Sequence, residues 1–516
     1  MRAFAALLFL PLALGACAGA PPPANAPVTP TAPPPEAPAP APVDPLRTTV
    51  PPPPESCRAE LAVDGAPGPS CADAGAARLG LAGALKLTGR ARDEKLAELE
   101  RCSVLPVGAI RALRADLATT GCADLLTGPW LSAPPSGLRA DVRDTLEGLD
   151  LAAKASRLVQ GPPALAEPHD KARVEQFVKT TLSEWIAQQA AAIFELSTRG
   201  ANLDGYGKGV IAVEAGLADL RFVDIAREVP VPVEFRTDPE LAEAYYTTLD
   251  QALEPRKERG RVAALVGLAK LAEQGVVKDA RVGRARVLLS RLYAGRRIDA
   301  LDGLLLPDAP RPSATGVEAD LARLLPTYHL GVLAPELATG ADDMLALALE
   351  NGVPRASRLT IDSGQRSDAA RRALARALFR SAQTHWSASD FAQAAALAAG
   401  LRLADMELIA ALAPILAKGP ANAAQMMQSV SELSPALRDV RALDALGAKS
   451  PSLAGFVDFD AALLLEIGRP ADSDAAYWKG VAARYEAAQR RLPPELRKLA
   501  TARHKNALDV AGAIPR

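Results

Sequence analysis

Basic residues gathered in one stretch of the chain are the side chains whose types and spacing best fit ligand binding. Guanidinium and ammonium groups bind phosphates and carboxylates, so this face would recognise an anionic partner such as lipid headgroups or cell-wall polymer. Arg281 and Arg284 can share one face of a helix, whereas Arg286 cannot join the same narrow stripe. The candidate anion-binding residues are Arg256, Lys257, Arg259, Arg261, Arg281, Arg284 and Arg286.

A stretch of the opposite charge directly precedes these residues. Acidic residues dominate residues 213–254, and basic residues dominate residues 255–297. Two such segments that follow one another in a helical protein can face each other. We therefore expect them to neutralise each other on solvated surfaces, and anion binding is the alternative.

No catalytic motif or pair of metal ligands is evident in the sequence. The four histidines lie far apart, and none has a second metal ligand three or four residues away. The signatures HExxH, GxSxG and SxxK are absent. The sequence thus predicts no catalytic residue, no metal site and no cofactor, and we expect a protein that is not an enzyme. The histidines are His169, His329, His385 and His504.

A glycine-rich run from Gly200 to Gly209 is the nearest approach to a phosphate-binding loop. A Walker loop requires GxxxxGK followed by Ser or Thr, but Lys208 is followed by Gly209, and Asn202 stands where the first glycine is needed. We expect a turn between two helices here, with anion contact by exposed amides as the alternative.

The N-terminus fits an export signal. An apolar run ending at Leu14 is much shorter than the roughly 20 residues of a membrane-spanning helix. Its ending, Leu14-Gly15-Ala16-Cys17, resembles the lipobox of bacterial lipoproteins. The resemblance implies that residues 1–16 are a signal peptide and that Cys17 carries a lipid. It also implies an outer-membrane lipoprotein, on the periplasmic face or alternatively at the cell surface.

With Cys17 set aside for the lipid, four cysteines remain, and an exported chain meets an oxidising compartment. Two disulfides are expected, and four cysteines allow three pairings. The pairs Cys57 with Cys71 and Cys102 with Cys122 are favoured because each flanks one short excursion of the chain. A metal or redox site needs closer spacing such as CxxC, which is absent.

A proline-rich segment follows the signal. Residues 18–56 contain 16 prolines and almost no charge. Such a chain adopts extended polyproline II at about 3.1 Å per residue, which is typical of a stalk. We expect residues 17–56 to be the lipid anchor and a disordered linker, with a ligand for a proline-binding groove as the alternative.

Composition and periodicity predict an all-α body. Apolar residues make up 49% of the 516 residues and aromatics only 4%, so alanine, leucine and valine must fill the core and favour closely packed helices. Three folded pieces are expected: a small disulfide-stabilised helical domain (57–131), a helical domain (138–312) and a helical-repeat domain (313–516). Apolar spacing predicts helices over residues 72–87, 93–102, 107–118, 138–158, 171–197, 370–381, 391–401, 459–467, 474–491 and 495–511.

Two segments resemble tetratricopeptide repeats, in which pairs of antiparallel helices stack through small and large apolar residues. In residues 377–397 the matching positions are Leu378, Ala382, Trp386, Phe391, Ala394 and Ala395. In residues 284–301 they are Leu289, Tyr293, Gly295 and Ala300. The resemblance implies an array of helical hairpins, either an α-solenoid or an irregular array.

Taken together, these features predict a lipid-anchored helical scaffold that binds another envelope protein. The alternatives are a cell-wall enzyme or enzyme activator, and a basic-face binder of anionic lipid or glycan. A formal net charge of -1 argues against nucleic acid as a partner. The membrane is expected to be reached only through the N-terminal lipid.

Overall fold

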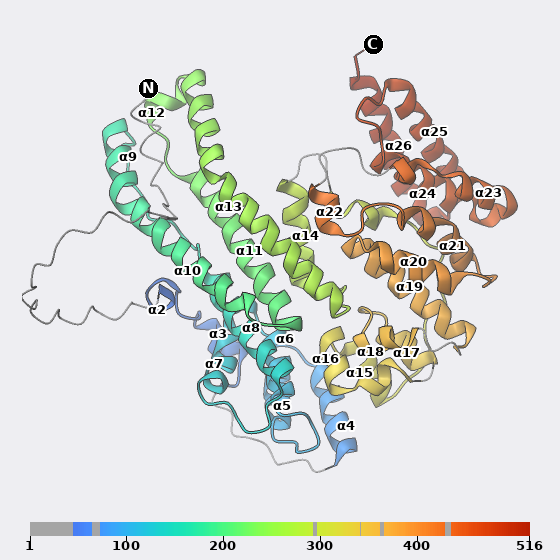
Figure 1. Ribbon diagram of the computed structural model, residues 1–516, viewed down its shortest axis with the longest axis horizontal. Coiled ribbons are helices and arrows are strands. Elements are labelled where there is room, and N and C mark those ends of the chain that lie inside the picture. The colour runs from blue at the N-terminus through green and yellow to red at the C-terminus, as the bar shows by residue number, and fades with distance from the viewer. Residues whose placement is uncertain are drawn as a thin grey trace, which may run out of the picture. The chain divides into compact units, whose positions relative to one another are not determined.

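The protein is helical throughout the part of the chain that the structure describes (Figure 1). This computed structural model describes residues 45–63, 73–292, 297–340, 342–361, 366–428 and 435–515. Turns and short 3-10 segments join the helices, and no strand occurs among these residues. The expected all-α class is confirmed. Residues 1–44, with the signal, Cys17 and most of the proline-rich linker, lie outside the described residues, as do Cys71, Tyr293 and Gly295.

The described residues form two compact units. The smaller unit holds residues 45–51, 158–195 and 219–258, and the larger holds residues 52–157, 196–218 and 259–515. The boundaries expected near residues 131 and 312 stay predictions.

The N-terminal half of the chain contains α2 (Pro45–Thr49), α3 (Ser56–Glu60), α4 (Ala74–Leu85), α5 (Gly89–Leu99), α6 (Ala109–Leu117), η1 (Thr120–Cys122), α7 (Asp124–Ser132), α8 (Ala140–Arg157), α9 (Lys171–Phe177), the π-helical η2 (Val178–Leu182), α10 (Ser183–Ala201), α11 (Gly205–Glu228), α12 (Val233–Arg236) and α13 (Pro239–Glu273). The C-terminal half contains α14 (Ala280–Leu292), η3 (Ala300–Gly303), α15 (Val317–Leu324), α16 (Thr327–Leu333), η4 (Pro335–Ala338), α17 (Asp342–Ala348), α18 (Arg355–Leu359), α19 (Asp368–His385), α20 (Ala388–Ala398), α21 (Ala404–Leu416), α22 (Ala423–Gln428), η6 (Pro435–Arg438), α23 (Arg441–Lys449), η7 (Pro451–Leu453), α24 (Ala454–Ile467), α25 (Ala475–Arg491) and α26 (Pro494–Ala513). Each stretch predicted to be helical contains a helix; the one over residues 171–197 is interrupted by η2.

The smaller unit is built around apolar side chains of α9, η2 and α10. Phe177 and Leu182 are buried together with Val229, and Trp185 packs against them. The Trp185 ring also stacks on Phe222, with 5.9 Å between the ring centroids. The aromatic residues of this stretch therefore belong to the core, as their helical spacing predicted.

The end of the proline-rich segment is folded, which corrects its predicted extent. Residues 45–49 form α2 and residues 56–60 form α3, although the linker was expected to continue to residue 56. Leu46 is buried in the smaller unit, and Cys57 is fully buried in the larger unit. The buried side chains of Leu46 and Cys57 give this segment apolar surface to pack.

The disulfide pairing differs from the favoured one. Cys57 bonds to Cys122, at a Cα–Cα distance of 5.3 Å and a sequence separation of 65 residues. Because Cys57 and Cys122 bond to each other, neither favoured pair is correct. Cys102 is also disulfide-bonded. The favoured pairs assumed closure of short loops. The actual bond ties α3 to η1 because helix packing brings these distant segments together.

The glycine-rich run is only partly a turn. The chain turns at residues 202–204, and the glycines from Gly205 onward belong to the first turns of α11. A Cβ on Gly207 would lie 1.9 Å from the carbonyl oxygen of Asp144, and one on Gly148 would lie 2.3 Å from that of Gly207. Gly148 and Gly207 therefore let the backbones of α8 and α11 touch, so helix packing accounts for Gly207.

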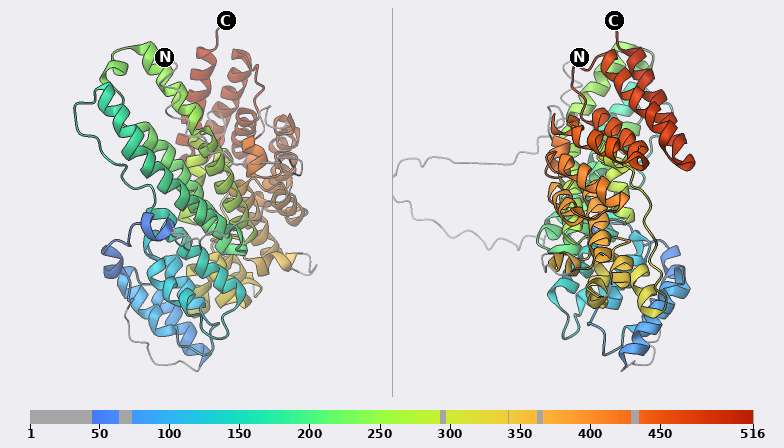
Figure 2. Two further views of the ribbon diagram at one scale, coloured as in Figure 1. Left: turned by 60° about the vertical axis from the view of Figure 1, so that its left-hand side comes forward. Right: turned by 90° about the vertical axis from the view of Figure 1, so that its right-hand side faces the viewer.

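The first helices of the larger unit pack against helices from much later in the chain. α4 contacts both α5 and α15, and the blue and yellow ribbons lie side by side in Figures 1 and 2. Leu81 and Leu96 share one buried cluster with Leu321 and Leu330. The predicted domain 57–131 therefore shares its core with residues beyond 313.

We call α19 to α26, residues 368–513, the C-terminal array. Its successive helices contact one another in chain order: α19 with α20, α20 with α21, α21 with α23, and then α24, α25 and α26 in turn. The orange to red ribbons of Figure 2 follow this order. α19 also contacts α21, the next helix but one. Both hairpins predicted here, α19–α20 and α24–α25, are present.

The two repeat-like segments differ. Residues 377–397 form the hairpin of α19 and α20, in which Leu378, Ala382, Trp386, Phe391 and Ala394 are buried. Residues 284–301 give α14 followed by the 3-10 turn η3, and the described residues of this segment contain no second α-helix. A helix pair is thus seen in the first segment, and the repeat resemblance of the second stays a prediction.

No described helix combines the length and the apolar character needed to cross a membrane.

Candidate functional site

The predicted basic residues of the smaller unit lie against acidic residues of the preceding segment. Arg256 donates to Asp219 at 3.0 Å, and its guanidinium lies 4.1 Å from the centre of the Phe222 ring. The ammonium group of Lys257 lies 3.4 Å from Asp250 and 3.5 Å from Glu254. The acidic and basic blocks thus neutralise each other here.

Three of the predicted basic residues of the larger unit are paired with acidic residues as well. Arg281 contacts Asp116 at 2.7 Å, Arg284 bonds Glu214, and Arg286 contacts Asp302 at 2.6 Å. Arg259 and Arg261 also have partners. Only Glu214 belongs to the acidic stretch 213–254, and Asp116 and Asp302 lie outside it. Glu214 and the carboxylate of Asp116 are buried, whereas the charge pattern predicts pairing on solvated surfaces. Binding of an anion by the seven residues stays a prediction.

A buried polar cluster forms around Asp116 in the larger unit. Arg281, His329 and Tyr206 all contact its carboxylate, at 2.7, 3.0 and 2.9 Å. Burial alone would raise the pKa of Asp116, but the charge of Arg281 and the hydrogen bond from His329 hold it well below its usual value. Tyr206 stacks on Tyr328 with 4.3 Å between ring centroids. The carboxylate is thus ionised and enclosed by its partners.

The histidines lie in separate environments. His329 belongs to the Asp116 cluster, whereas Nε2 of His385 lies 2.8 Å from the Val276 carbonyl oxygen. Burial lowers the pKa of His385 to about 4, so it is neutral. Nε2 of His169 contacts the Leu165 carbonyl oxygen. The described residues contain no group of three or more side chains that could hold a metal ion.

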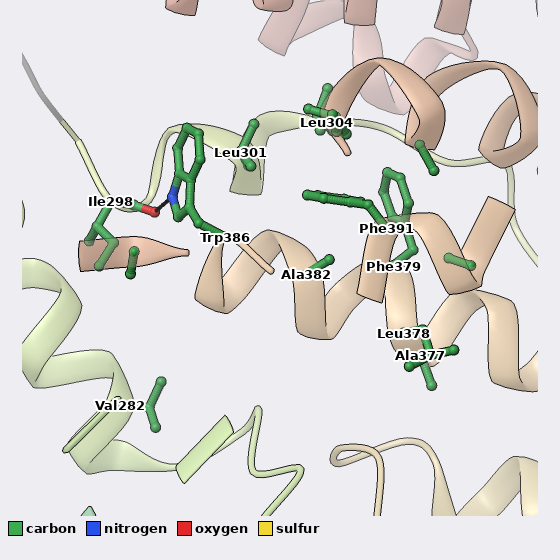
Figure 3. Close-up of a cluster of buried hydrophobic side chains, with 14 of the residues drawn as sticks. Val282, Ile298, Leu301, Leu304, Ala377, Leu378, Phe379, Ala382, Trp386 and Phe391 are labelled. Atoms are coloured by element: carbon green, nitrogen blue, oxygen red, sulfur yellow. Dashed lines mark hydrogen bonds between the residues drawn. The ribbon is translucent and has the colours of Figure 1, made fainter. Parts of the chain in front are cut away.

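The most distinctive contact surface lies on the C-terminal array, which holds a short piece of the same chain. We call this piece, residues 298–307, the inner segment; it begins with Ile298, contains the turn η3 and continues as extended chain to Pro307. Ile298 and Leu301 are fully buried, Leu304 is nearly so, and Leu305 is half-buried. Figure 3 shows Ile298, Leu301 and Leu304 beside Trp386, Ala382 and Phe391 of the array.

Polar side chains of the array bind the backbone of the inner segment. Nε1 of Trp386 donates to the carbonyl oxygen of Ile298 at 2.7 Å, as drawn in Figure 3. Gln383 donates to that of Leu301 at 3.0 Å, and Arg376 to that of Pro307 at 2.8 Å.

A fourth backbone contact comes from α24. The Leu305 amide donates to Oδ1 of Asp460 at 2.9 Å, and Oδ2 has no partner. Burial raises the pKa of Asp460 well above its usual value, and the single bond from Leu305 opposes this only in part. A raised carboxyl pKa is typical of general acids, but this carboxyl is fully enclosed and its one bonded oxygen binds the chain's own backbone.

A hollow lies on the surface of the array between α21 and α23. Its volume is about 450 Å³, and it is lined by Ala411, Pro414 and Ile415 together with Asp439 and Arg441. Arg441 donates to Asp439 at 2.7 Å, and this exposed pair lowers the pKa of Asp439 to about 2. The groove is apolar along α21 and charged at its edge.

Comparison with known proteins gives no match: no family model, no curated protein and no solved structure is similar to this chain.

The sequence analysis did not predict the residues that bind the backbone of the inner segment. Gln383 and Asp460 fall in ordinary helices, and no motif marks them. The run Leu304-Leu305-Leu306-Pro307 is a visible signal, because an apolar run ended by proline predicts a short extended segment in the core. Its partners could not be identified, since they are up to 155 residues away.

Proposed function

We propose that the protein is a non-enzymatic helical scaffold, anchored through a lipid on Cys17, that binds another protein of the cell envelope. The contacts of the C-terminal array carry this proposal. Helices that contact their neighbours in chain order are the basis of α-solenoids, whose faces bind extended partners. The 450 Å³ groove between α21 and α23 supplies an open surface of this kind.

Two further features support the proposal. Disulfides persist in oxidising compartments, and Cys57, Cys102 and Cys122 are all disulfide-bonded. The buried ionisable groups are enclosed: the Asp116 carboxylate is held by three side chains, and Asp460 binds a backbone amide. Both arrangements favour a binding surface over a catalytic pocket.

Crosslinking in intact cells tests the scaffold. A photo-reactive amino acid replaces Ala442, which is exposed at the groove, and the matched control replaces Lys95, which is exposed on α5. The scaffold predicts a stoichiometric crosslinked partner from position 442 and none from position 95. Equal, diffuse labelling from both positions would contradict it.

A separate variant tests the anchor. Cys17→Ser removes the thiol that would carry the lipid, so the protein should move from the membrane fraction to the soluble fraction. Unchanged membrane association would refute the lipid anchor and leave the scaffold to be judged by the crosslinks.

A further inference from the structure

The inner segment lies on the array in the manner of a bound peptide. Arg376, Gln383 and Trp386 reach carbonyl oxygens, and Asp460 accepts an amide. On the inner segment these four contacts involve backbone atoms only, so any sequence able to adopt the same backbone path can make them. The apolar contacts then select the side chains.

Those apolar contacts are specific to a leucine-rich sequence. Leu301 and Leu304 enter the buried cluster that includes Phe379, Phe391 and Leu463. The backbone also approaches closely at Gly303, where a Cβ would lie 3.0 Å from the Leu463 side chain and 3.4 Å from Arg503. The surface thus accepts leucines on either side of a residue that needs no side chain.

Charge further limits the ligand. Burial raises the pKa of Asp460 well above its usual value, and Arg376 is already bonded to Asp405 at 2.8 Å. A ligand that placed a charge beside Asp460 would lose hydration without gaining a partner. An uncharged apolar stretch meets this requirement, as Leu304 to Pro307 does.

We propose that the face of α19 and α24 that holds the inner segment is a peptide-binding site. Its ligand is a leucine-rich segment of a partner protein that is uncharged where it passes Asp460, and the inner segment occupies the site until the partner displaces it. This inference rests on the proposed scaffold function and names the chemistry of its partner. Displacement is local: Leu305 and Leu306 are only half-buried, so the segment's end can leave first.

A labelled synthetic peptide tests the site directly. The peptide has the sequence of residues 298–307, and its binding to the full-length protein is followed by fluorescence anisotropy. The double variant Leu305→Ser/Leu306→Ser weakens the occupant without touching the array. It should bind the peptide at least tenfold more tightly than wild type does.

Two controls assign the binding to this face. Adding Gln383→Ala to the double variant removes a backbone contact and should weaken peptide binding about fivefold. Adding Arg441→Ala, on the exposed edge of the other groove, should leave it unchanged. A folded double variant that does not bind the peptide, or that binds it equally well with Gln383→Ala, overturns the inference.

A second measurement applies if the double variant does not fold. The same peptide with a photo-reactive group in place of Leu305 is added to wild-type protein, and the labelled residues are mapped by mass spectrometry. Labelling of α19 or α24 supports the site, and labelling elsewhere or none refutes it. The scaffold itself is judged separately, because crosslinks from position 442 do not involve this face.

Discussion

Asp116 and Asp460 are both buried carboxylates of the larger unit, but their surroundings differ. Arg281, His329 and Tyr206 surround Asp116, and the charge of Arg281 keeps it ionised. Asp460 has a single backbone donor, Leu305, and burial raises its pKa, which favours the protonated form. Asp116 is bound by side chains of the protein's own helices. Asp460 is bound by a backbone amide, which a segment of another chain could also supply.

This difference separates a structural core from a recognition surface. A fully satisfied ionic cluster fixes the helices that contribute to it, and removal of one member leaves charges without partners. A half-satisfied carboxyl tolerates exchange of its single donor. We therefore expect changes around Asp116 to affect stability strongly, and changes around Asp460 to affect binding and pH dependence.

The largest expected effect comes from Asp116→Asn. The amide leaves the buried guanidinium of Arg281 without its main counter-charge, which should cost roughly 3–5 kcal/mol of unfolding free energy. Urea unfolding at pH 7 measures this loss. Asp439→Asn is the matched control, because it breaks an exposed pair and should change stability far less than Asp116→Asn does. Equal losses in the two variants would remove the distinction.

Acid should destabilise the array through His385. Burial lowers its pKa from 6.5 to about 4, so the unfolded chain takes up the proton first as pH falls. The stability that neutral His385 contributes is complete above pH 6.5 and is lost as pH falls towards 4, by roughly 3 kcal/mol. The difference in unfolding free energy between wild type and His385→Gln should shrink as pH falls from 6.5 to 4. A constant difference between them would contradict the shift.

The stability contributed by Asp460 should change with pH in the opposite direction to that contributed by His385, and Asp460→Asn tests this. The raised pKa of Asp460 means that the folded state holds a proton that the unfolded state releases near pH 4, so wild-type stability falls as pH rises above that value. The asparagine has no proton to lose. It should match the stability of wild type near pH 4 and exceed it at pH 8. Thermal unfolding at both pH values checks this, and a gain at pH 4 alone would refute it.

The smallest expected effect is that of Gln383→Ala on stability. The variant removes one hydrogen bond to the Leu301 carbonyl, worth about 1 kcal/mol. The loss should appear as faster local exchange of residues 301–305 rather than as a lower global unfolding midpoint. A large fall in the midpoint would place the inner segment in the fixed core beside Asp116.

Local patterns predicted the helices well because each depends on nearby residues. The hairpin of α19 and α20 follows from its apolar stripes and the capping residue Ser387, whose side chain accepts from the Asp390 amide. The Cys57–Cys122 bond, the Gly148–Gly207 contact and the Asp460–Leu305 bond join distant segments, and no local spacing encodes them. The candidate site was missed for this reason: its ligand and its receptor belong to one chain but lie far apart in it.

Hydrogen exchange of the wild-type protein, read residue by residue, tests the central claim most directly. If the inner segment is a displaceable ligand, the Leu305 amide will exchange through local openings, with a free energy well below that of the core amides of α19 and α24. Added peptide of residues 298–307 will speed this exchange further. Exchange of Leu305 only through global unfolding, unaffected by the peptide, would contradict the account.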